Sequence, residues 1–84
     1  MLIRKFEPIY ANEKSFYGKA QVVENGSITE LYSYGTLVAT YNSVDNIVKV
    51  VDTFSNTTVR HIKEFIRQTT GQVASLSDIR KLID

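Results

Sequence analysis

Residues 54–67 read Phe-Ser-Asn-Thr-Thr-Val-Arg-His-Ile-Lys-Glu-Phe-Ile-Arg, and the fold is best worked out from this stretch. Its apolar residues recur at the three- and four-residue spacing of an amphipathic helix that packs on a core. Thr57 and Thr58 offer side-chain oxygens to the N–H groups of the first turn. Gly71 suits the left-handed position that ends a helix near Thr70. The predicted core positions are Val59, Ile62, Phe65 and Ile66.

The same helix carries three cations along one flank. At about 100° per residue, Arg60, Lys63 and Arg67 fall within roughly 60° of one another, beside the apolar stripe. We name these three residues the basic ridge. A ridge of this kind predicts contact with phosphates or with an acidic protein surface. The alternative is a solvated helix flank whose charge Glu64 partly neutralises.

His61 is the only histidine of the chain, and it stands three residues before Glu64. That spacing occurs in metal sites, but a metal needs further ligands, and the chain has no cysteine and no run of clustered carboxylates. The favoured interpretation is a polar helix face on which Glu64 pairs with Arg60 or Arg67. No nucleophile elbow and no glycine-rich phosphate loop accompany His61. We therefore expect no metal, no cofactor and no enzymatic activity, and we retain His61 only as a binding residue beside the basic ridge.

The dipeptide Asn25-Gly26 is the strongest turn signal, because a two-residue type I′ loop needs positive φ at both positions. If these two residues form the loop, Glu24 lies opposite Ser27. One face of the resulting hairpin is small and suits the close approach of a helix, whereas the other is large and aromatic. The small face consists of Gly18, Ala20, Val22, Thr29, Leu31 and Ser33, and the large face includes Tyr17, Lys19, Tyr32 and Tyr34.

The remaining segments complete a fold of the α+β class. Gly35 indicates a bulge or bend, and the apolar run 47–53 indicates a strand that is central or well covered. Pro8 argues against a central strand in the first dozen residues. Ser75, with Asp78 three residues later, predicts the start of a short last helix. We expect one domain over residues 1–84, a three- to four-stranded antiparallel meander with one main helix packed on one face and a short C-terminal helix.

The tyrosine-rich face of the hairpin is a second candidate surface. Tyr17, Tyr32 and Tyr34 are suited to stacking on bases of a single strand or to anchoring a protein partner. The open alternatives are a homodimer through this face, or its coverage by residues 1–14. If the main helix packs on the small face, the tyrosines and the basic ridge lie on opposite sides of the sheet. That separation weakens the hypothesis of nucleic-acid binding.

Composition narrows the class of protein. The net charge is +1, from ten basic and nine acidic residues, which is below the basic excess typical of proteins that bind duplex DNA. The absence of cysteine fits a reducing cytosol. Residues 1–8 contain no apolar signal-peptide region, and no run approaches the length of a membrane span. We expect a cytoplasmic protein with no membrane partner.

Two segments carry a resemblance to a known group of proteins. They follow the patterns Ser-Tyr-x-Thr-x-Val-Ala, over residues 33–39, and Ser-x-Thr-Thr-x-Arg-His-x-x-Glu-Phe, over residues 55–65. Together they resemble small proteins of unknown function that phages and prophages of Gram-positive bacteria encode. The resemblance implies an accessory protein that binds a bacterial macromolecule and inhibits a host or defence component, for example a CRISPR-type system. The alternative is an accessory protein that binds nucleic acid through the basic ridge.

Overall fold

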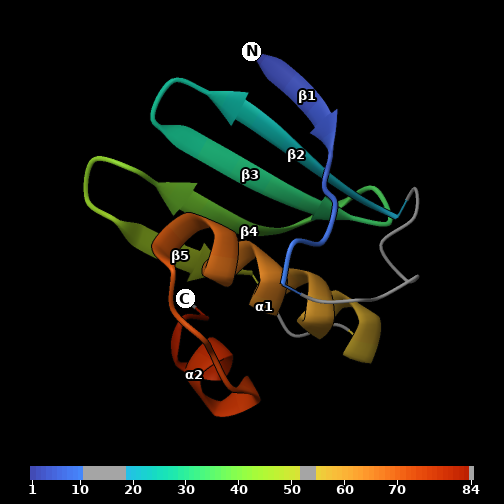
Figure 1. Cartoon of the computed structure of the whole chain (residues 1–84), viewed down its shortest axis with the longest axis vertical. Coiled ribbons are helices and arrows are strands. Elements are labelled where there is room, and N and C mark those ends of the chain that lie inside the picture. Colours follow the sequence, from blue (N-terminus) through green and yellow to red (C-terminus); the bar gives the residue numbers. More distant parts are fainter. Residues whose placement is uncertain (11–18, 52–54, 84) are drawn as a thin grey trace.

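The computed structural model describes residues 1–10, 19–51 and 55–83. In this part of the chain, five strands form one antiparallel sheet in the order β1-β2-β3-β4-β5. Helix α1 lies across one face of the sheet, and α2 lies beyond it towards the β5 edge (Figure 1). The elements are β1 (Leu2–Lys5), β2 (Ala20–Asn25), β3 (Ile28–Ser33), β4 (Thr36–Asn42), β5 (Ile47–Val50), α1 (Asn56–Thr70) and α2 (Leu76–Lys81).

The predicted α+β class and antiparallel order are confirmed, but the predicted three to four strands are too few. The additional strand is β1, which pairs with β2 at the edge of the sheet. Pro8 does not prevent this pairing, because β1 ends at Lys5. The proline lies after the strand, where its missing N–H group removes no bond of the ladder.

The first hairpin turns one residue later than predicted. Asn25 pairs with Ile28, so Gly26 and Ser27 form the loop. Gly26 has a φ of 62°, whereas Asn25 keeps negative φ and remains in the strand. Glycine at the first loop position is the arrangement of a type II′ turn. The register therefore differs by two residues from the prediction, and because side chains alternate with a period of two, the predicted faces are kept.

The second hairpin is tighter than Gly35 alone suggested. Tyr34 and Gly35 form its loop, with φ of 53° and 79°, between the paired residues Ser33 and Thr36. Positive φ at both positions is the requirement of a type I′ turn. The bulge or bend predicted at Gly35 is therefore a turn, and a bulge lies within β4, where Val38 is the extra residue of the ladder.

Helix α1 packs on the small face of the first hairpin, as predicted. Its residues Ile62, Phe65 and Ile66 are buried, and Val59 is partly buried against them. Ser55 caps the N-terminus by accepting a hydrogen bond of 3.2 Å from the Thr58 N–H, so the cap precedes the two threonines that were expected to supply it. The core consists of Phe6, Ala20, Val22, Leu31, Val38, Ala39, Val48, Val50, Ile62, Phe65, Ile66 and Ile79.

The C-terminal end of the chain closes the β5 edge. The strand predicted to be central or well covered is not central, since β5 is the edge strand, and it is covered on one face only, since its burial alternates along the chain. The Val50 N–H donates to the Leu82 carbonyl at 3.2 Å, and Ile83 forms a parallel bridge to Val50. The predicted short helix is confirmed as α2, with Ile79 fully buried.

Candidate functional site

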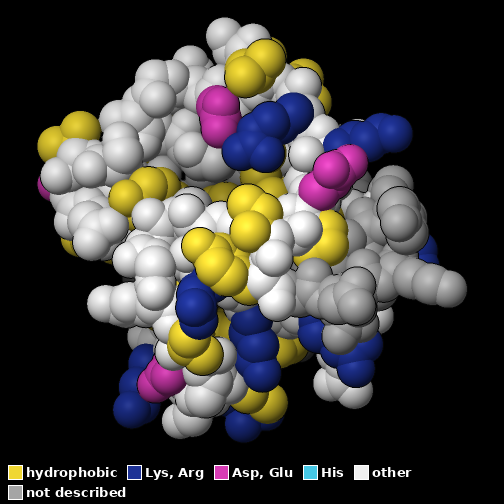
Figure 2. All heavy atoms as spheres, viewed as in Figure 1, with side chains coloured by type: hydrophobic (Ala, Val, Ile, Leu, Met, Phe, Trp, Pro, Cys, Tyr) yellow, Lys and Arg dark blue, Asp and Glu magenta, His cyan; other side chains and the backbone are white. Residues whose placement is uncertain are grey.

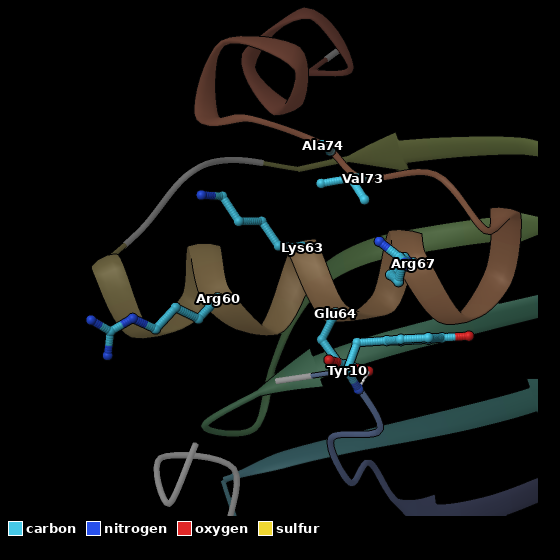
Figure 3. Close-up of a pocket in the computed structure, with 7 residues that line it drawn as sticks. All are labelled: Tyr10, Arg60, Lys63, Glu64, Arg67, Val73 and Ala74. Atoms are coloured by element: carbon cyan, nitrogen blue, oxygen red, sulfur yellow. Dashed lines mark hydrogen bonds between the residues drawn. The ribbon is translucent and has the colours of Figure 1, made fainter. Parts of the chain in front are cut away.

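The basic ridge lines a pocket on the outward side of α1. Arg60, Lys63 and Arg67 contribute to a hollow of about 330 Å³. Tyr10 and Glu64 lie on one side of the helix, and Val73 and Ala74 lie on the other (Figure 3). We name this hollow the basic pocket, and its full lining is Tyr10, Arg60, Lys63, Glu64, Arg67, Val73 and Ala74.

The turn at the end of α1 supplies one wall of the basic pocket. Gly71 has a φ of 79°, and its N–H donates to the Arg67 carbonyl at 3.0 Å. This left-handed cap reverses the chain, as predicted from the glycine. The segment after it returns beside the helix and brings Val73 and Ala74 to the pocket.

Residues 6–10, which we name the N-terminal strap, supply the opposite wall. The Phe6 ring contacts the Phe65 ring edge to face, with 5.9 Å between centroids. Further along, the Gln68 side-chain amide donates to the Glu7 carbonyl at 2.8 Å. The strap is thus tied to α1 by an aromatic contact and by hydrogen bonds, and its last residue, Tyr10, reaches the pocket.

Glu64 is the main attachment point of the strap. One of its oxygens, Oε2, accepts hydrogen bonds from the Ile9 N–H at 3.0 Å, the Tyr10 N–H at 3.3 Å and the Gln68 side-chain amide at 2.6 Å. Only 3% of Glu64 is exposed, so the expectation of a solvated polar face at this position is wrong. Sequence reasoning missed this role, because the donors lie 54 and 55 residues away and no local pattern marks them.

Tyr10 and Arg67 form a cation–π contact at the pocket. The Arg67 guanidinium carbon lies 4.5 Å from the centroid of the Tyr10 ring. The Tyr10 residue is 59% exposed, and Val73 on the other wall is 75% exposed. The pocket therefore combines cations with exposed apolar surface. Figure 2 shows basic and apolar side chains intermixed over the half of this face that α1 and α2 occupy.

His61 lies between α1 and the sheet rather than in the basic pocket. It is fully buried, and its Nδ1 is 2.9 Å from Ser33 Oγ, which in turn is 3.1 Å from Thr58 Oγ1. The serine–histidine distance suits proton transfer, but Ser33 is only 2% exposed. We interpret this cluster as a structural link between β3 and the first turn of α1.

The predicted pair of His61 and Glu64 is divided between two environments. His61 bonds to Ser33 in β3, whereas Glu64 bonds to the strap. In the described ranges 1–10, 19–51 and 55–83, no three histidine, aspartate or glutamate side chains are grouped as metal ligands.

The predicted tyrosine face is only partly correct. Tyr32 lies on the outer face of the sheet, the face opposite α1, since its neighbours Leu31 and Ser33 are buried on the inner face. Tyr34 does not share that face, because its positive φ in the turn directs its ring towards α1, 6.2 Å from the His61 ring. Tyr17 lies outside the described residues.

The helix side of the sheet therefore carries aromatic as well as basic residues. Tyr34 is 56% exposed, and Lys19 Nζ lies 6.0 Å from its ring centroid. Tyr10 joins the basic ridge on the same side. Coverage of the outer face by residues 1–14, one of the open alternatives, does not hold for residues 6–10, since this strap lies against α1.

The comparisons with known proteins identify a family. The chain belongs to a family of unknown function, DUF8033, whose model matches residues 4–81. Searches of the curated proteins and of the solved structures found no match. The family is thus one of unknown function, as the resemblance implied, whereas a phage origin stays a prediction. None of the helices in the described part of the chain has the length and apolar character needed to span a membrane.

Proposed function

We propose that this protein is a small non-enzymatic binding protein, and that its basic pocket binds an acidic segment of a bacterial protein. The observation that carries the proposal is the gathering of Arg60, Lys63 and Arg67 around one hollow with exposed apolar walls. Three cations in one place attract an acidic segment and orient it during encounter. The apolar walls can bury a side chain of the partner, which charges alone cannot do.

The composition of the pocket is typical of a protein interface. Tyrosine and arginine are enriched among the residues that dominate binding energy, and Tyr10 and Arg67 are in contact here. Val73 and Ala74 form an apolar wall beside them. A volume of about 330 Å³ is large enough for one or two side chains of a partner.

The biological setting belongs to the same proposal. The two segments at residues 33–39 and 55–65 resemble phage and prophage proteins, so we propose a phage-type inhibitor of a host or defence component in the bacterial cytoplasm. The second of these segments contains Arg60 and His61. The resemblance therefore covers part of the basic ridge as well as the buried link to Ser33.

A pull-down from bacterial lysate, with and without nuclease, tests the function. The pocket variant carries Arg60→Gln, Lys63→Gln and Arg67→Gln together. A matched control carries Lys49→Gln, Arg80→Gln and Lys81→Gln, which removes the same charge at exposed positions outside the pocket. We expect wild type and control to retain the same protein after nuclease treatment, and the pocket variant to lose it. Equal retention by the two variants would contradict the proposal.

Nucleic-acid binding is the second candidate, and one observation favours it. Tyr34 and Tyr10 lie on the same side of the sheet as the basic ridge, so stacking and phosphate contacts share one surface. The predicted separation of the tyrosines from the basic ridge was an argument against nucleic-acid binding, and it does not apply to Tyr34 and Tyr10. Three phosphate contacts would give a slope of log K against log salt of about −2 to −3. Recovery of nuclease-sensitive RNA or DNA alone, lost in the pocket variant, would favour this candidate.

A further inference from the structure

We infer that Glu64 is a positioning residue: through the N-terminal strap and Tyr10, it holds the Arg67 guanidinium ready to bind a carboxylate of the partner. This inference rests on the proposed function, because it assigns the acidic group of the partner to one cation of the basic pocket. It also gives Arg67 a role beyond its charge, because the protein orients its guanidinium.

The first step runs from Glu64 to the strap. Glu64 Oε2 accepts from two successive backbone N–H groups, those of Ile9 and Tyr10, and from the Gln68 amide. Hydrogen bonds to an ionised carboxylate are stronger than neutral ones, and burial strengthens them further. The Glu64 residue is only 3% exposed. It therefore determines where the backbone of Tyr10 lies.

The second step runs from Tyr10 to Arg67. With its backbone held by Glu64, Tyr10 places its ring 4.5 Å from the Arg67 guanidinium carbon. A guanidinium over an aromatic ring is attracted through its face, and its N–H donors at the edge can still bind a carboxylate in two parallel hydrogen bonds. The Arg67 guanidinium makes no hydrogen bond to the described residues. Its donors are thus available in an orientation that the protein sets in advance.

A simple charge argument predicts the opposite effect for Glu64. The carboxylate is a negative charge at the edge of a basic pocket. If charge alone governed binding, Glu64→Gln would raise the affinity for an acidic ligand. If Glu64 acts by positioning Tyr10 and Arg67, the same substitution lowers the affinity. The sign of the change therefore discriminates between the two explanations.

The test uses the full chain and a fluorescent peptide of four glutamates around one leucine, acetylated and amidated, with binding followed by anisotropy. The substitutions are Glu64→Gln, Tyr10→Leu and the two combined. Glu30→Gln is the matched control, because it removes one carboxylate in the same way outside the pocket lining. We expect about two- to fivefold weaker binding for each single variant, as the loss of one cation–π contact implies. The double variant should bind the peptide at least as tightly as the weaker-binding of the two single variants. The control should bind it as wild type does.

A second measurement reports on Arg67 without any ligand. The Nε–Hε resonance of Arg67 in NMR spectra reflects the ring that lies against the guanidinium. We expect this resonance to move in Glu64→Gln as it does in Tyr10→Leu, and to stay in place in Glu30→Gln. A melting temperature confirms that each variant is folded, and Tyr10→Leu keeps the test valid if Glu64→Gln unfolds.

Three results would overturn the inference. They are tighter peptide binding by Glu64→Gln, an Arg67 resonance that moves in neither Glu64→Gln nor Tyr10→Leu, or no binding of the peptide by wild type. Failure of the proposed function is distinguishable from these results. If the pull-down partner is lost in the pocket variant but kept by Glu64→Gln and Tyr10→Leu, the function stands and the positioning role falls. If the peptide behaves as expected but no bacterial protein is retained, the positioning role stands and the function falls.

Discussion

At the scale of single residues, His61 and Glu64 are both buried polar residues of α1, and each bonds to a separate set of partners. His61 bonds to Ser33 under the helix, and Glu64 bonds to the strap beside it. Buried polar groups in folded proteins are almost always hydrogen-bonded, because an unsatisfied one costs about 1–3 kcal/mol. The helix can bury both residues only because the partners come from elements far away in the sequence.

The apolar positions of α1 were easier to predict than these polar ones. Ile62, Phe65 and Ile66 follow from helical spacing alone, and the structure buries all three. The burial of Glu64 was not predictable, since glutamate is a typical surface residue and its helical position lies beside the basic ridge. Glu64 is buried because the strap, which comes from the other end of the chain, lies against it.

Phe65→Ala tests the packing at this scale. The ring is 1% exposed and contacts Phe6 of the strap as well as the sheet-facing core. We expect a loss of about 3–5 kcal/mol in the free energy of unfolding, from lost burial and from the cavity left behind. Denaturant titration measures the change. Val73→Ala, at an exposed position, is the control and should change stability by less than about 0.5 kcal/mol. Equal midpoints for the two variants would contradict the packing described here.

At the scale of elements, the sequence predicted which strands pair more accurately than how they are aligned. Asn25-Gly26 and Gly26-Ser27 are both acceptable hairpin loops, and local turn chemistry does not choose between them. The choice falls to the later loop, which places Ala20 opposite Ser33 and Val22 opposite Leu31. Either loop leaves these four residues on the face under α1, because the two registers differ by two residues, so the pattern of the faces does not choose between the loops either.

The cap of α2 gives a prediction about pH. Hydrogen bonds from the backbone N–H and the hydroxyl of Ser75 lower the pKa of Asp78 below its usual value of 3.8, and Lys81 adds a smaller effect in the same direction. A lowered pKa in the folded state stabilises the protein above the unfolded value, and this contribution disappears as the pH falls through the folded value. We expect the start of α2 to loosen only below pH 3.8.

Hydrogen exchange of the Asp78 amide, followed from pH 6 to acid, measures this effect after correction for the intrinsic rate. Its N–H donates to Ser75 Oγ at 3.2 Å, so protection of that amide reports on the cap. Asp78→Asn keeps the shape but removes the titrating group, and its protection should not change in that range. A loss of protection already near pH 5 would contradict the lowered pKa.

At the scale of the whole molecule, the two sides of the sheet differ in character. The helix side carries the basic pocket, whereas the outer face carries Tyr32 and exposed apolar residues such as Ile3 and Ile47. A homodimer through the outer face, which we keep as a proposal, would leave the basic pocket accessible. Partner binding and self-association would then be independent, and sedimentation at low micromolar concentration with and without the acidic peptide would show it.

Salt should separate the forces that hold the fold from those that bind a partner. At the edge of the sheet, Arg4 and Glu24 form an ion pair at 3.1 Å, and their side chains are 47% and 37% exposed. An exposed pair of this kind contributes about 0–1 kcal/mol, so the fold depends mainly on its buried apolar core. Raising the salt concentration should therefore change the melting temperature little.

Binding of the acidic peptide should respond strongly to the same change. The charge that attracts it is concentrated in one pocket, although the whole chain carries a net charge of only +1. At about 1 M salt the screening length falls to about 3 Å, so the long-range attraction of Arg60 and Lys63 is largely lost. We expect the affinity to fall several-fold between low salt and 1 M salt, while the melting temperature stays within a few degrees. An affinity independent of salt would mean that Tyr10 and Val73 bind the partner without the basic ridge, and it would remove the charge argument on which the proposed function rests.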